Sequence, residues 1–155
     1  GKNRVKSVSY VRKNCTALPV AKCHKRKIQN ILLILLPLLA VILHALPTAV
    51  VYRVYLGSGY VLRQASGFDR TIVGYGAFLP YLAGIDACIC VACGVLRLRE
   101  TDLRFTQRLR SFALCGAILR NVGVKHLTLE GLLTTILLIC VFLIANSIVQ
   151  KESVL

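Results

Sequence analysis

Three long apolar stretches run along the chain, and polar, mostly basic segments separate them. They cover residues 28–52, 71–96 and 131–149, and the only charged residue within them is Asp86. About 20 apolar residues, at roughly 1.5 Å each, are enough to cross a hydrocarbon core of roughly 30 Å. The pattern therefore predicts an all-α integral membrane protein with three transmembrane helices at these positions.

Four polar segments flank the predicted spans. Residues 1–27 form a basic segment, 53–70 a loop, 97–130 a second basic segment and 150–155 a tail. Within 97–130, four apolar side chains recur at roughly helical spacing among arginines: Leu98, Phe105, Leu109 and Phe112. This spacing predicts an amphipathic helix that lies in the plane of the lipid headgroups.

The distribution of Lys and Arg predicts which ends face the cytoplasm. Of the 20 basic residues, nine precede the first span, three lie between the first and second, seven lie between the second and third, and one follows. Cytoplasmic loops carry the excess of Lys and Arg. We therefore expect the N-terminus and residues 97–130 in the cytoplasm and residues 53–70 outside. With three spans, the C-terminus would also lie outside, and we expect the plasma membrane as the location.

Composition and motifs argue against several classes of function. The chain is 56% hydrophobic, above the roughly 45–50% of a typical globular domain. No nucleic-acid module follows the basic segment, so nucleic acid is not an expected partner. No catalytic triad, phosphate-binding loop or pair of carboxylates is present, so neither an enzyme nor a cofactor is predicted. Cys88, Cys90 and Cys93 lack a second ligand cluster at zinc spacing, so no metal is expected. The chain contains no Met, and we expect it to be part of a longer protein.

Polar residues inside the spans are the candidate functional groups. An ionised carboxylate at the middle of a span costs about 2.5–3.5 kcal/mol on insertion scales, so Asp86 should point into a helix bundle. His44 lies three residues before Pro47, where a helix bend would free backbone carbonyls. His44, Asn146 or helices beyond this chain are the candidates to accompany Asp86. A hydrogen-bond lock, an ion site and a proton relay all remain open, as does a protonated Asp86 bonded to a backbone carbonyl.

The pattern across residues 22–115 resembles the sixth and seventh helices of rhodopsin-like G-protein-coupled receptors, of the divergent invertebrate chemoreceptor type. His44-Ala45-Leu46-Pro47 stands where that family has Cys-Trp-x-Pro, with the proline kept and the tryptophan absent. Asp86-Ala87-Cys88-Ile89-Cys90 keeps only the acid of the family's Asn/Asp-Pro-x-x-Tyr motif. Residues 97–112 are similar to the family's eighth helix, and Cys115 then corresponds to its palmitoylated cysteine.

This resemblance implies a fragment of a seven-helix chemoreceptor with an unknown ligand, in which Pro47 is the bend and Asp86 the polar lock. It also implies a basic surface for a heterotrimeric G protein and anionic membrane lipid, formed by Lys22, Lys25, Arg26, Lys27, Arg97, Arg99, Arg104 and Arg108. The third span departs from the family, because a receptor ends after its eighth helix. Two alternatives stay open: a small structural or scaffold subunit of a membrane complex, and a transporter fragment that uses Asp86 for proton or ion coupling.

Overall fold

The structure of the chain is a computed structural model that describes residues 20–70, 78–99, 102–122 and 128–153, with side chains from residue 27 onward. The chain divides into two units, Gly1–Ile31 and Leu32–Leu155. The contacts described below all lie within the second unit. The described elements are helix α2 (Val20–Ala45), strands β1 (Val50–Leu56) and β2 (Gly59–Ala65), and helices α4 (Phe78–Arg99), α5 (Leu103–Asn121) and α6 (Leu129–Ser153).

Three of the four described helices overlap the predicted spans and share their apolar composition. The segments Lys27–Ala45, Phe78–Arg99 and Leu129–Glu152 are long and apolar enough to cross a membrane. Large apolar side chains also remain exposed along these helices, for example Leu35, Ile85 and Leu143. Such a surface is unusual for a protein surrounded by water. The three apolar helices therefore suggest a membrane location.

The first span is shorter than the sequence pattern predicted. The prediction carried it to Tyr52 with a bend at Pro47, but α2 ends at Ala45 and β1 begins at Val50. Proline lacks an N–H donor and disfavours a helical conformation at the residue before it, here Leu46. Pro47 thus follows the end of the helix, whereas Pro37 lies inside α2.

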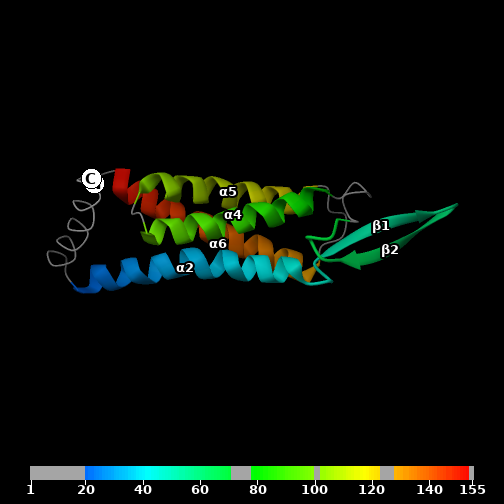
Figure 1. The fold of residues 1–155 in the computed structure, drawn as a ribbon, viewed down its shortest axis with the longest axis horizontal. Helices are drawn as coiled ribbons and strands as arrows, with labels where there is room; N and C mark the ends of the chain where they lie inside the picture. Colours follow the sequence, from blue (N-terminus) through cyan, green and yellow to red (C-terminus); the bar gives the residue numbers. More distant parts are fainter. Residues whose placement is uncertain (1–19, 71–77, 100–101, 123–127, 154–155) are drawn as a thin grey trace. The chain divides into compact units, whose positions relative to one another are not determined.

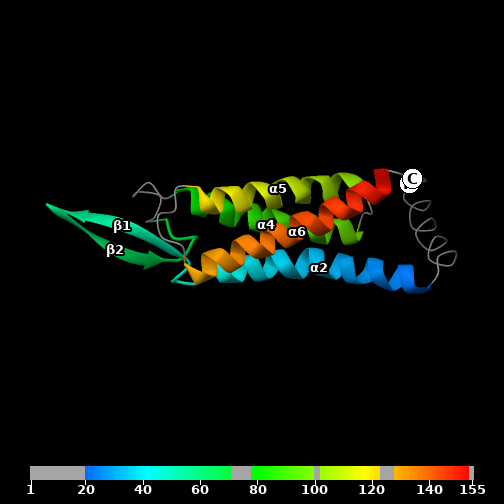
Figure 2. The same cartoon turned by 180° about the vertical axis from the view of Figure 1, so that it is seen from behind.

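The predicted outer loop 53–70 contains most of an antiparallel β-hairpin, so the fold is not purely helical. The register pairs Val50 with Ala65 and Leu56 with Gly59 across a two-residue turn. Gly57 in this turn has a φ of 61° and is the only described residue with positive φ, which fits a type II′ turn with glycine at its first central position. Figures 1 and 2 show the hairpin extending beyond the ends of α4, α5 and α6.

Helix α5 packs lengthwise against α4 and α6, which differs from the predicted helix in the headgroup plane (Figures 1 and 2). Its buried face is largely small: Thr106, Leu109, Ala113, Gly116 and Ala117, followed by Arg120. Small residues let helix backbones approach closely and so favour packing between helices. The arginines that made the segment look amphipathic lie mainly on its first half, where Arg104 and Arg108 are exposed.

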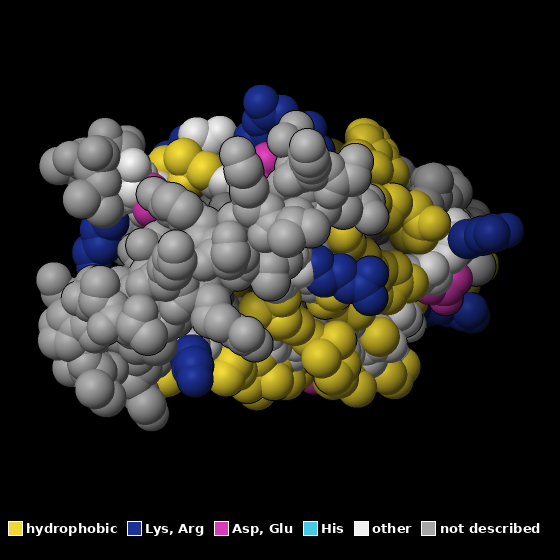
Figure 3. Space-filling model, turned by 60° about the vertical axis from the view of Figure 1, so that its left-hand side comes forward, with side chains coloured by type: hydrophobic (Ala, Val, Ile, Leu, Met, Phe, Trp, Pro, Cys, Tyr) yellow, Lys and Arg dark blue, Asp and Glu magenta, His cyan; other side chains and the backbone are white. Residues whose placement is uncertain are grey.

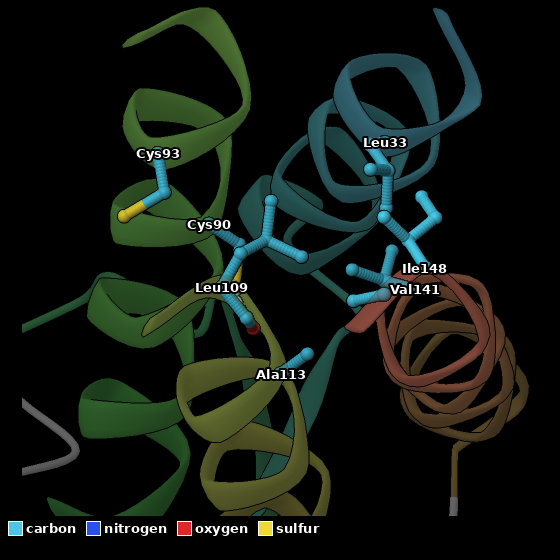
Figure 4. Close-up of a cluster of buried hydrophobic side chains, with 8 residues drawn as sticks. Leu33, Cys90, Cys93, Leu109, Ala113, Val141 and Ile148 are labelled. Carbon is cyan, nitrogen blue, oxygen red and sulfur yellow. Dashed lines mark hydrogen bonds between the residues drawn. The ribbon is translucent and has the colours of Figure 1, made fainter. Parts of the chain in front are cut away.

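Two apolar clusters form the interior of the bundle. The larger joins Leu33 of α2, Cys90 of α4, Leu109 of α5 and Val141 of α6, together with their neighbours (Figure 4). The smaller, nearer the hairpin, joins Ala40, Ala87, Ala117 and Leu138. Because each cluster takes side chains from all four helices, residues 32–45, α4, α5 and α6 form one four-helix core.

Candidate functional site

His44 lies in the last turn of α2 and is fully buried. Its Nε2 is 2.8 Å from the carbonyl oxygen of Pro80, and because that oxygen only accepts, Nε2 carries the donated proton. The Phe68 ring packs edge-on against the imidazole, with ring centroids 5.3 Å apart. Gly67 and Gly84 leave the room for the imidazole, since a Cβ at either position would overlap it. His44 therefore joins α2, α4 and the segment after β2.

Arg120, at the end of α5, is only 3% exposed. Its Nη2 donates to the carbonyl oxygen of Ala49, which also accepts a hydrogen bond of 2.8 Å from Thr128 Oγ1. Thr128 Oγ1 in turn accepts from the backbone N–H of Gly131 in the first turn of α6. These bonds hold the residue before β1 between the ends of α5 and α6.

Thr48 adds a further contact at the same place. Its hydroxyl donates to Glu130 Oε1 at 2.8 Å, so the segment between α2 and β1 is attached to the first turn of α6 as well. We call Thr48, Ala49, Arg120, Thr128 and Glu130 the hairpin anchor. Its hydrogen bonds fix where the hairpin leaves the bundle.

Asp86 lies near the middle of α4 and is 9% exposed. It faces α5, where the Cys115 side chain interacts with its carboxyl group and Gly116 lies against its Cβ. Its second oxygen, Oδ2, has no hydrogen-bond partner among the described residues. Asp86 thus points into the bundle, as its cost in lipid predicts, and its described polar partner is a thiol.

The four predicted lock residues do not form one cluster. Asn146 Oδ1 accepts a hydrogen bond of 3.1 Å from Arg110 Nη1, which joins α5 to α6. Asp86 joins α4 to α5 and His44 joins α2 to α4, while Pro47 lies in the turn before β1. The polar contacts are therefore distributed over three helix pairs. No sequence pattern indicated Cys115 or Arg110 as their partners.

The cysteines do not suggest a metal site in the described part of the chain. There, no three His, Cys, Asp or Glu side chains gather as metal ligands would. Cys88 and Cys115 are exposed free thiols, and Cys90 is buried with its Sγ 3.8 Å from the carbonyl oxygen of Leu109. Cys115 lies in the second half of α5 rather than beyond the end of a headgroup helix, the position predicted for a palmitoylated cysteine.

The predicted basic surface is described only in part. The side chains of Lys22, Lys25 and Arg26 lie outside the described residues, and Lys27 is exposed. Arg99, Arg104 and Arg108 are exposed and Arg97 is half-buried, at the end of α4 and in the first half of α5. Figure 3, turned to bring that end forward, shows Lys and Arg side chains beside apolar surface.

The hairpin carries several exposed aromatic and aliphatic side chains. Tyr55 is 71% exposed, Tyr60 53% and Leu62 46%. The two tyrosine rings lie 6.2 Å apart, and the Arg53 guanidinium lies 4.6 Å from the centre of the Tyr60 ring. Two short runs rich in Val and Tyr, on either side of the turn residues Gly57-Ser58-Gly59, are the signal that would have predicted this hairpin.

Comparisons with known proteins found no matching family model, no matching curated protein and no matching solved structure.

Proposed function

We propose that this chain is a small membrane subunit that presents its β-hairpin to a protein partner. The observation that carries the proposal is the exposure of apolar and aromatic side chains on a hairpin that projects from the helical bundle (Figure 2). Exposed apolar groups on a rigid element are typical of a protein interface, and Tyr and Arg are enriched where binding energy is concentrated.

The hairpin anchor supports this role. A two-stranded hairpin is at best marginally stable by itself in water, and here its base is held by hydrogen bonds from Arg120 and Thr128 to Ala49. A fixed base reduces the conformational entropy that a partner would have to remove on binding. Burying an arginine is costly. In this proposal, the buried Arg120 serves to fix the position of the hairpin.

The positions of the arginines support an orientation of the bundle in the membrane. Arg97, Arg99, Arg104 and Arg108 surround the end of the bundle that lies away from the hairpin. By the positive-inside rule this end is cytoplasmic, where the arginines meet anionic lipid headgroups, and the hairpin lies outside. With α5 as a fourth crossing helix, the end of α6 lies on the cytoplasmic side.

The receptor interpretation stays a prediction. In the receptor family the helix after the seventh span lies in the headgroup plane, whereas α5 packs along α4 and α6, and this packing favours a subunit. The full-length reading frame separates the two: five further spans upstream support a receptor, and a start codon just before Gly1 supports a subunit. A transporter role for Asp86 is tested by Asp86→Asn, since unaltered transport would exclude the role.

Site-specific photo-crosslinking in native membranes tests the subunit proposal. A benzophenone amino acid at Tyr60 should give one discrete protein adduct. The same probe at Leu114, which is 42% exposed on the apolar half of α5, is the matched control and should react with lipid. Equal adducts at the two sites, or none at Tyr60, would contradict the proposal.

A further inference from the structure

The outer edge of β2 is open along its length. Every residue from Gly59 to Gln64 is exposed, and within the described residues β2 pairs only with β1. Natural edge strands are usually protected by proline, bulges or several charges. The sequence of β2 has no proline, and Arg63 is its only charged residue. A strand of this kind is a template for another strand.

The register determines which backbone groups this edge offers. Leu56 and Gly59 flank a two-residue turn and form the first hydrogen-bonded pair, so every second pair bonds within the hairpin. Tyr60, Leu62 and Gln64 therefore direct their N–H and C=O groups away from β1. Leu62 is the middle residue of the strand Gly59–Ala65.

A second copy of β2 fits this edge in an antiparallel arrangement. With Leu62 opposite Leu62, the two strands overlap completely, and Tyr60 of each copy lies opposite Gln64 of the other. All outward groups then form reciprocal hydrogen bonds, because the middle residue faces outward. The central leucines contact each other on the face that carries Tyr60. The two Arg63 side chains are diagonal neighbours, roughly 7–8 Å apart, where salt screens their repulsion.

The direction of the strands decides where the second copy is. In both ribbon views the strands run along the bundle axis (Figures 1 and 2), which for spanning helices lies roughly along the membrane normal. Two copies in one membrane therefore present β2 strands that run in the same direction. Copies in two facing membranes present strands that run in opposite directions, as the antiparallel register requires.

We propose that the partner of the hairpin is a second copy of this chain in a facing membrane, joined edge to edge through β2 around Leu62. The inference rests on the proposed function and names the partner. The overlapping strands of seven residues, at about 3.3 Å each, span about 23 Å. The proteins would then hold the membranes apart by about that distance.

Vesicle clustering tests the inference with the full chain alone. The purified protein is placed in vesicles of neutral phosphatidylcholine, so that its basic residues do not bridge anionic lipid, and trypsin access confirms that the hairpins face outward. Two vesicle populations with different dyes should cluster, with a gap of about 23 Å between bilayers. Leu62→Arg, which sets like charges opposite each other, should reduce clustering about tenfold or more.

Two further variants make the test specific. Leu56→Arg adds the same charge at the tip of β1, away from the edge, and should cluster as the parent chain does. Vesicles with Leu62→Arg should cluster again when mixed with vesicles that carry Leu62→Glu. No clustering by the parent chain, or no rescue in the mixture, would overturn the inference. If the Tyr60 probe then still captures a different protein in native membranes, the subunit proposal stands and only the second copy is excluded.

Discussion

Gly94 in α4 is the position where a small added group tests the contact between α2 and α4. A Cβ there would lie 2.8 Å from the carbonyl oxygen of Leu33 and 3.0 Å from Cγ1 of Ile34, whereas ordinary van der Waals contact begins at 3.4 Å. The Leu33 oxygen belongs to the helix backbone, so it can move only if α2 moves. The absence of a side chain at Gly94 is thus what lets the two helices approach.

The variant Gly94→Val should destabilise the bundle by about 1–2.5 kcal/mol. Inserting methyl groups into a well-packed interior costs roughly 1–3 kcal/mol. Valine recovers only about 0.3 kcal/mol of this through its better helix propensity. The displacement of α2 would also loosen the cluster around Leu33, Cys90 and Val141, which all four helices share.

The assay is equilibrium unfolding in mixed micelles with a rising fraction of dodecyl sulfate, followed by far-ultraviolet circular dichroism. The matched control is Ala92→Val, because Ala92 is exposed on the same helix two residues away. Gly94→Val should unfold at a lower dodecyl sulfate fraction than the control. Equal midpoints for the two variants would show that α2 and α4 are not in contact at Gly94, and the four-helix core would be refuted.

Three other predictions follow from the same contacts. Gly67→Ala should speed trypsin cleavage at Arg63, because the added Cβ would overlap the His44 ring and displace the segment after β2. The control Gly59→Ala adds a Cβ that meets nothing within 4 Å and should leave the cleavage rate unchanged. Equal rates for the two variants would count against the packing of His44. A double-mutant cycle of Asp86→Ala and Cys115→Ala should give a coupling of about 0.5–1.5 kcal/mol, and strict additivity would argue against an interaction between the two side chains. Cysteines placed at positions 58 and 122 of a cysteine-free chain should react with an impermeant reagent from one side, and those at 99 and 152 from the other; labelling of 122 together with 99 would exclude α5 as a crossing helix.

The apolar helices were predictable because their signal is local. Continuous runs almost free of charge identify the spans. The orientation of Asp86 toward the bundle interior follows from the cost of a carboxylate in lipid. That reasoning correctly directed Asp86 into the bundle. It could not name Cys115, because the contact depends on how α5 is aligned with α4, and no local pattern fixes that alignment.

The end of the first span was misplaced for a different reason. Val50, Val51 and Tyr52 are as apolar as the helix before them, so hydropathy alone continued the span through them. Because membrane helices tolerate proline, the sequence predicted only a bend at Pro47. The enrichment of Val and Tyr from Val50 to Leu56 and the glycine at position 57 carry the strand signal. That signal separates the strand from the helix where hydropathy does not.

Helix α5 shows the limit of span prediction most clearly. Its four arginines reduce its hydropathy below that of a spanning helix, yet Ala113, Gly116 and Ala117 allow it to pack closely between α4 and α6. A helix that is too polar to enter lipid alone can be covered by neighbours that enter first, which makes its insertion a consequence of tertiary packing. In the topology that we propose, α5 is a fourth crossing in addition to the three candidate spans. An additional crossing reverses the side of everything that follows it, so the proposed topology places Arg120 on the hairpin side and not in the cytoplasmic segment. There its buried guanidinium holds Ala49, and the residue that looked like one more cytoplasmic charge becomes part of the support for the hairpin.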